Sequence, residues 1–139
     1  MASSPKPDLA RQRLLTMQAA GALVLAKLLV AFVPLRFWRG SLGLGEAHAG
    51  GVGEAGGQFL AGRVERAAAR LPFDTKCLPR AMALSWMLRR RKQAHEVVIA
   101  VRPPDLREGD DGLHAWVEAG NATLIGDLPG PWHEIYRAR

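Results

Sequence analysis

The longest hydrophobic run of the chain extends from Leu14 to Val33 and predicts a helix of about 20 residues, long enough to cross a bilayer. Lys27 interrupts this run, and a charge near the centre of a membrane helix is costly. We therefore favour a buried helix packed on the domain over a transmembrane span. The residues that follow, Arg36, Trp38 and Arg39, combine charge with an aromatic ring and keep an interfacial membrane contact open.

The next segment, Ser41 to Gly57, is rich in glycine and is interpreted as a connection or surface loop. Gly51 to Gly56 has the letters of a dinucleotide-binding fingerprint, but that fingerprint requires a preceding strand, and no run of β-forming residues precedes it. Gln58 to Leu71 then carries apolar residues at helical spacing with arginines between them. This pattern predicts an amphipathic helix that ends before Pro72.

The segment from Cys77 to Arg91 has the pattern of another helix, buried over much of its surface. Asp74 and Thr75 offer side-chain oxygens for capping its start, and Pro79 suits a first helical turn, where its missing N–H costs nothing. The cations at the other end, Arg89 to Arg91, complement the negative pole of the helix dipole. The sequence therefore predicts that Cys77 begins this helix.

After this helix the hydrophobic period becomes strand-like. Glu96 to Val101 predicts a buried strand, Leu113 to Glu118 alternates as a second strand, and Ala122 to Ile125 predicts a third. Gly120-Asn121 predicts a tight hairpin turn between the last two strands. The order of elements predicts an α+β fold in which N-terminal helices precede a small antiparallel sheet and the Cys77 helix packs on that sheet.

The length of 139 residues suits one compact unit. Within it we separate residues 1–57, which hold the apolar helix and the glycine-rich connection, from a core of residues 58–139. Met1 to Asp8 lacks the features of a signal peptide, and a single cysteine excludes an internal disulfide framework. We therefore expect a cytoplasmic protein, with membrane association left open.

The net charge of +6 and the pI near 10.4 fit nucleic acid, a membrane surface or an acidic peptide as the partner. Arg89 to Arg91 has no aromatic platform interleaved with its charges, so we favour the helix-dipole explanation and expect no nucleic acid. The four histidines are scattered without the spacing of zinc ligands, so we expect no metal site.

Cys77 is the candidate nucleophile because a helix N-terminus favours the thiolate over the thiol. The alternative is a small buried apolar side chain. Nucleophilic catalysis by cysteine also needs an imidazole to move the proton and an acid to orient the imidazole, and His114 and Asp127 follow in that order. A half-buried strand histidine and a solvated turn aspartate remain open alternatives for these two residues.

Several motifs resemble the transglutaminase-like leader peptidases of lasso-peptide biosynthesis, in order over about Phe59 to Gly126. The motifs are Cys77-Leu-Pro-Arg80 before an arginine-ended helix, Val98-Ile-Ala-Val-Arg102, and His114-Ala-Trp116-Val-Glu118. The resemblance implies a papain-like or transglutaminase-like cysteine peptidase that cuts the leader from a ribosomally made precursor. The freed core amino terminus would then be closed into a ring by a separate ATP-dependent cyclase.

In that family the nucleophile, base and orienting acid map onto Cys77, His114 and Asp127. We expect the Cys77 backbone N–H to donate to the oxyanion and Trp116 to wall the pocket. Glu118 shares a strand side with His114 but lies about 13 Å along the strand, too far to orient it. The resemblance also implies the precursor peptide and a separate leader-recognition protein as partners, with no cofactor for the peptidase.

Other readings of the chain stay open. The main alternative is a non-catalytic, basic membrane- or peptide-binding module in which Cys77 is structural. A further alternative is transferase chemistry, because an amine can resolve the same acyl-thioester that water resolves in a peptidase.

Overall fold

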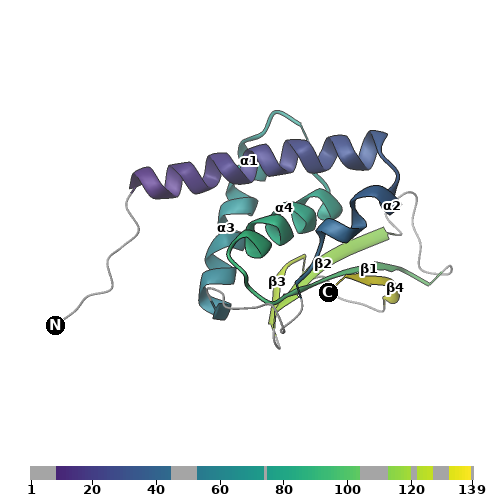
Figure 1. Ribbon diagram of the computed structural model, residues 1–139. Helices are drawn as coiled ribbons and strands as arrows, with labels where there is room; N and C mark the ends of the chain where they lie inside the picture. The colour runs from purple at the N-terminus through teal and green to yellow at the C-terminus, as the bar shows by residue number, and fades with distance from the viewer. Residues whose placement is uncertain are drawn as a thin grey trace.

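The computed structural model of the chain describes residues 9–44, 53–73, 75–103, 113–119, 122–126 and 132–138. Helices come first and cover one side of a four-stranded antiparallel sheet (Figure 1). This arrangement confirms the predicted order of helices followed by a small antiparallel sheet. The helical elements are α1 (Leu9–Phe32), α2 (Leu35–Trp38), η1 (Arg39–Ser41), α3 (Gly53–Arg70) and α4 (Cys77–Arg90). The strands are β1 (Glu96–Val101), β2 (Leu113–Ala119), β3 (Ala122–Ile125) and β4 (His133–Ala138).

One side of α1 packs against α3 and α4 and the other side is exposed. The packed side carries small and branched residues at helical spacing, Leu15, Ala19, Leu23 and Ala26, all buried. The expectation of a buried helix is therefore correct for one face and wrong for the other, which no described element covers. Among the described residues, α1 is also the one helix long and apolar enough to cross a membrane, by length and composition alone.

The glycine-rich connection is shorter than predicted, because α3 begins at Gly53 rather than at Gln58. Gly57 lies inside this helix, and a Cβ atom there would approach the Leu124 side chain to 2.9 Å. The small residue thus permits close packing of α3 on β3, which propensity alone does not reveal. The predicted division after residue 57 falls within this helix. Residues 45–52 lie outside the described residues.

Helix α4 begins at Cys77, as predicted, and Pro79 is buried in its first turn. The predicted capping by side-chain oxygens is wrong for Thr75, because the cap residue is Lys76 and no side chain donates or accepts a cap hydrogen bond. The Thr75 hydroxyl instead accepts a hydrogen bond of 3.3 Å from Arg80 Nε. Asp74 lies outside the described residues.

The sheet has the order β3-β2-β1-β4. The three predicted strands are present, with β2 one residue longer than expected, and the turn Gly120-Asn121 lies outside the described residues. Strand β4 was not predicted. Its first residues, His133 to Ile135, are exposed and lack a clear alternation, so its identity as a strand depends on pairing with β1.

A buried hydrogen-bond chain joins α4 to β1. The His95 Nδ1–H donates to the Gln93 carbonyl at 2.8 Å, because a carbonyl can only accept. Its Nε2 atom therefore accepts from the Ser85 hydroxyl at 2.6 Å, and that hydroxyl oxygen accepts from the Gly43 N–H at 2.8 Å. Burial lowers the pKa of His95, which favours the neutral ring that this chain of hydrogen bonds requires.

Candidate functional site

The Cys77 side chain is half-buried at the first residue of α4, where α4 approaches α1. A helix start presents backbone N–H groups that lack intrahelical acceptors, and Pro79 contributes none. The donors of this first turn are therefore the N–H groups of Cys77 and Leu78. A pocket of about 340 Å³ opens beside the thiol between the two helices. Its lining residues are Lys27, Val30, Ala31, Lys76, Cys77, Leu78 and Pro79.

His114 is the second residue of β2 and is buried, with 8% of its surface exposed. Its Nε2 atom lies 2.5 Å from the carbonyl oxygen of Gly126. A carbonyl can only accept, so Nε2 carries the hydrogen and, in the neutral ring, Nδ1 holds the free lone pair. The nitrogen of His114 that is able to take a proton is therefore Nδ1.

Gly126 is a site residue that the sequence did not reveal. Its backbone has φ of +83°, and a Cβ atom at this position would lie 2.6 Å from the Ala115 carbonyl oxygen and 3.1 Å from Trp116 Cα. A left-handed backbone and close contact with β2 both favour glycine. The signal available in the sequence was a glycine directly before Asp127, which by itself indicates an ordinary turn.

Two tryptophan rings lie next to the His114 ring. The Trp132 ring stacks on the imidazole with centroids 4.9 Å apart, and the Trp116 ring lies 5.8 Å away in a tilted orientation. The Arg102 guanidinium lies 4.5 Å from the centre of the Trp132 ring. Trp116 therefore borders the His114 ring, but it is not among the residues that line the pocket beside Cys77, and Trp132 was not anticipated. Trp86 lies elsewhere and donates its indole N–H to Ser41 Oγ.

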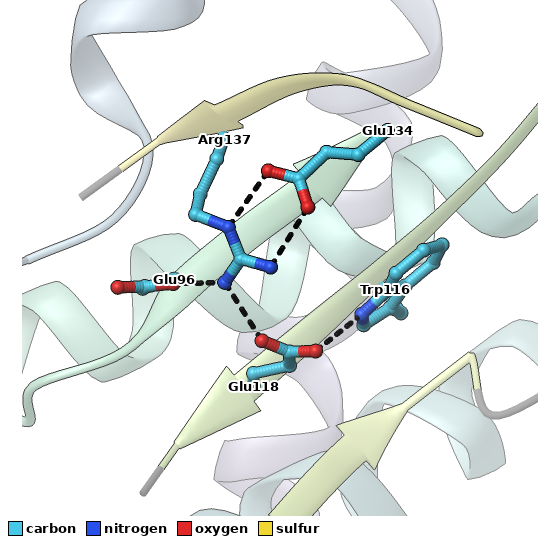
Figure 2. Close-up of polar contacts among 5 residues, drawn as sticks. All are labelled: Glu96, Trp116, Glu118, Glu134 and Arg137. Carbon is cyan, nitrogen blue, oxygen red and sulfur yellow. Dashed lines mark hydrogen bonds and ion pairs between the residues drawn. The ribbon is translucent and has the colours of Figure 1, made fainter. Parts of the chain in front are cut away.

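Glu118 belongs to an ion cluster centred on Arg137 (Figure 2). The Arg137 guanidinium also pairs with Glu96 and Glu134, and the Trp116 indole N–H donates to the other Glu118 oxygen at 2.9 Å. Burial alone would raise the pKa of Glu118, but the hydrogen bonds from Trp116 and Arg137 bring it below its ordinary value. Glu118 thus holds Trp116 in place.

The structure brings the elements that carry Cys77 and His114 into contact, since α4 packs on β2. By alternation along the strand, however, His114 belongs to the face of β2 that is turned away from α4. The Ala115 and Val117 side chains of β2 lie in the core beneath the helices. Because side chains alternate along a strand, His114 lies on the opposite face of the sheet, together with Trp116. Among the described residues, the hydrogen bond shown for the His114 ring goes to Gly126. Asp127 lies outside the described residues.

No group of three or more histidine, cysteine, aspartate or glutamate side chains that could hold a metal ion occurs within the part of the chain that the structure describes. The chemistry available here is that of a thiol, an imidazole and backbone donors. This set fits acyl transfer through a cysteine thioester.

No curated protein and no solved structure matches the chain. A family model described as the transglutaminase-like superfamily matches residues 22–137, from the second half of α1 into β4. The matched range includes Cys77 and His114, and this superfamily is typically cysteine-protease-like. The chain belongs to the transglutaminase-like superfamily.

Proposed function

We propose that the protein is a cysteine peptidase that cleaves the leader from a ribosomally synthesised lasso precursor. The observation that carries the proposal is the position of Cys77, at the first residue of a helix and beside an open pocket, within a transglutaminase-like domain. The motifs around Cys77 and His114 add the resemblance to leader peptidases.

In the proposed reaction His114 takes the proton of the Cys77 thiol, and the resulting thiolate attacks the carbonyl carbon at the end of the leader. The Cys77 backbone N–H donates to the oxyanion, since it lies at the start of α4. The C–N bond then breaks, and the imidazolium of His114 gives its proton to the leaving core amine. Water, deprotonated by His114, attacks the thioester and releases the leader carboxylate and the free thiol.

This reaction requires Nδ1 of His114 to reach the thiol. The His114 ring lies on the face of β2 opposite the helices. For the ring to reach Cys77, the start of β2 would have to move so that the ring passes to the side of the sheet that carries α4. Catalytic hydrogen bonds in unliganded proteins are often long or poorly aligned and tighten with substrate bound, but this proposal requires a larger movement of His114. In this proposal the Gly126 carbonyl keeps the hydrogen on Nε2, and Asp127, the next residue, stabilises the charged ring.

The proposal includes two partners beyond the precursor. A separate leader-recognition protein would present the precursor, as the resemblance to leader peptidases implies. The product, a core peptide with a free amino terminus, would be the substrate of a lasso cyclase that forms the macrolactam.

Cleavage of a candidate precursor, with the recognition protein present, tests the proposal. We expect wild type to release leader with a free carboxylate, Cys77→Ala and His114→Ala to lose activity by about 1,000-fold or more, and Asp127→Asn to lose less. Cleavage retained by Cys77→Ala would exclude the peptidase and favour a binding module with a structural cysteine.

Acyl transfer is the second candidate, because the superfamily supports protease and acyltransferase chemistry alike. Product mass separates the two, since hydrolysis adds water to the leader carbonyl and transfer adds an amine. A leader product that carries an added amine in place of the free carboxylate would assign the protein to transfer.

A further inference from the structure

The side of α1 that faces away from α3 and α4 forms one apolar stripe. Its members follow helical spacing and are 38% to 79% exposed. We call this surface the outer stripe, and it consists of Leu14, Met17, Val24, Leu25, Leu28 and Phe32. It runs for about 27 Å along the helix at 1.5 Å per residue. A continuous apolar surface of this length on a protein exterior marks a site of contact.

The charges around the outer stripe lie at its two ends. Arg11 and Arg13 are exposed before it, and Arg36 and Arg39 are exposed after it. The one charged residue between them in sequence is Lys27, whose ammonium lies 4.5 Å from the centre of the Phe73 ring, on the side of the domain body. The stripe is therefore apolar along its length and cationic at both ends.

We propose that α1 lies flat on an anionic phospholipid membrane, with the outer stripe among the acyl chains and the arginines at the phosphate groups. An in-plane helix needs an apolar face and cationic residues for anionic headgroups, and α1 together with the residues just after it provides both. A protein groove would have to be apolar over the same length and acidic at both ends, whereas at a bilayer surface the long arginine side chains at either end of the stripe can extend to the phosphate groups above it. The charge pattern thus favours lipid over a protein partner.

The packing of α1 argues for an in-plane position rather than a span. Leu15, Ala19 and Leu23 lie buried against the rest of the domain, and a span would remove them from it. In the in-plane position these contacts remain, and the outer stripe is the face that enters lipid. This inference does not depend on the proposed peptidase reaction.

Flotation of the full-length protein with vesicles tests the inference. We expect binding to phosphatidylcholine vesicles that contain phosphatidylglycerol, weaker binding to phosphatidylcholine alone, and loss of affinity as salt rises. Leu25→Glu should weaken binding about tenfold or more, because it places a carboxylate in the stripe. Ala69→Glu adds the same charge at an exposed position of α3 and should bind like wild type. Circular dichroism shows whether both variants fold.

A charge-neutralising pair tests the arginines. Arg36→Gln with Arg39→Gln should weaken binding to the anionic vesicles by about tenfold or more. Arg66→Gln with Arg70→Gln removes equal charge from exposed positions of α3 and should have a smaller effect. Absence of binding, equal binding by folded Leu25→Glu, or equal losses in the two arginine pairs would overturn the inference. A lipid-free dimer that Leu25→Glu disperses would assign the stripe to a second copy instead.

Discussion

The orientation of His114 depends on one backbone carbonyl and on the residue that provides it. Gly126 brings its oxygen to Nε2 by a left-handed backbone, and no room remains there for a side chain against Ala115. The consequence is chemical, because the carbonyl fixes which ring nitrogen is basic. A main-chain group thus performs part of the orienting role that the sequence assigns to Asp127.

Gly126→Ala should lower the free energy of unfolding by about 1 to 3 kcal/mol, because the new Cβ meets the backbone of β2 and the left-handed conformation disfavours alanine. Urea denaturation measures the change. Gly62→Ala is the matched control, since a Cβ atom at this exposed helical glycine of α3 meets nothing within 4 Å. We expect that control to be neutral or to stabilise by about 0.5 to 1 kcal/mol. An unchanged Gly126→Ala protein would contradict the geometry.

Glu118 should contribute a small acid-sensitive part of the stability. Its folded pKa lies below the ordinary value of 4.5, so the contribution is complete above pH 4.5 and is lost as pH falls through the lower folded value. The side chain is 33% exposed, so solvent screening keeps the effect to about 1 kcal/mol or less.

Glu118→Gln should therefore lose stability at pH 7 and converge with wild type as pH falls below the folded pKa of Glu118, as followed by urea midpoints. Glu65→Gln alters a more exposed pair with Arg80 and should change stability by no more than about 0.5 kcal/mol. A constant difference between Glu118→Gln and wild type at every pH would refute the proposed ionic origin.

At the scale of elements, hydrophobic periodicity located the helices and the first strands because each has a buried face. Helix α4 and strand β1 are clear in the sequence for this reason. The start of α3 and strand β4 are less clear, because glycines such as Gly57, which packs close to the Leu124 side chain of β3, mask the helical pattern, and β4 is defined by pairing with β1. Such features depend on residues distant in sequence, as do the Trp132 stack and the Gly126 contact.

The His95 chain should make the joint between α4 and β1 sensitive to acid. Burial places the folded pKa of His95 below its ordinary value of 6.5, so the unfolded chain binds the proton more readily. The stability contribution is complete above pH 6.5 and falls as pH drops toward the folded value, by no more than about 1.4 kcal/mol per pH unit.

Thermal unfolding between pH 7.5 and 5, in steps of about 0.5 pH unit, measures this slope. His95→Gln should flatten the dependence of stability on pH. His133→Gln, at an exposed position in β4, should leave this dependence unchanged. Equal slopes in wild type and His95→Gln would show that another group causes the acid sensitivity.

For the molecule as a whole, α1 determines how the chain is organised. The sequence predicts one compact unit, and α1 packs on α3 and α4, where Leu23 belongs to the hydrophobic core that the helices share with the sheet. The same helix lines the pocket beside Cys77 and carries the proposed lipid-binding stripe. One element thus links the core, the candidate site and the exterior.

Leu23→Ala should destabilise the whole domain by about 2 to 5 kcal/mol in a single cooperative transition, because it leaves a cavity at a fully buried position. Leu25→Ala, on the exposed side of α1, is the control and should change stability by no more than about 0.5 kcal/mol. Differential scanning calorimetry measures both. Two separate transitions in wild type would show instead that α1 forms an independent unit.

In the proposed reaction Cys77 carries the leader as a thioester. Mass spectrometry of an acid-quenched reaction with precursor tests it most directly, with peptide mapping to locate the bound acyl group. We expect an adduct with the mass of the leader on Cys77 that is absent from Cys77→Ala, and this variant should also fail to cleave the precursor. Precursor cleavage by Cys77→Ala, or an adduct at another residue, would contradict it.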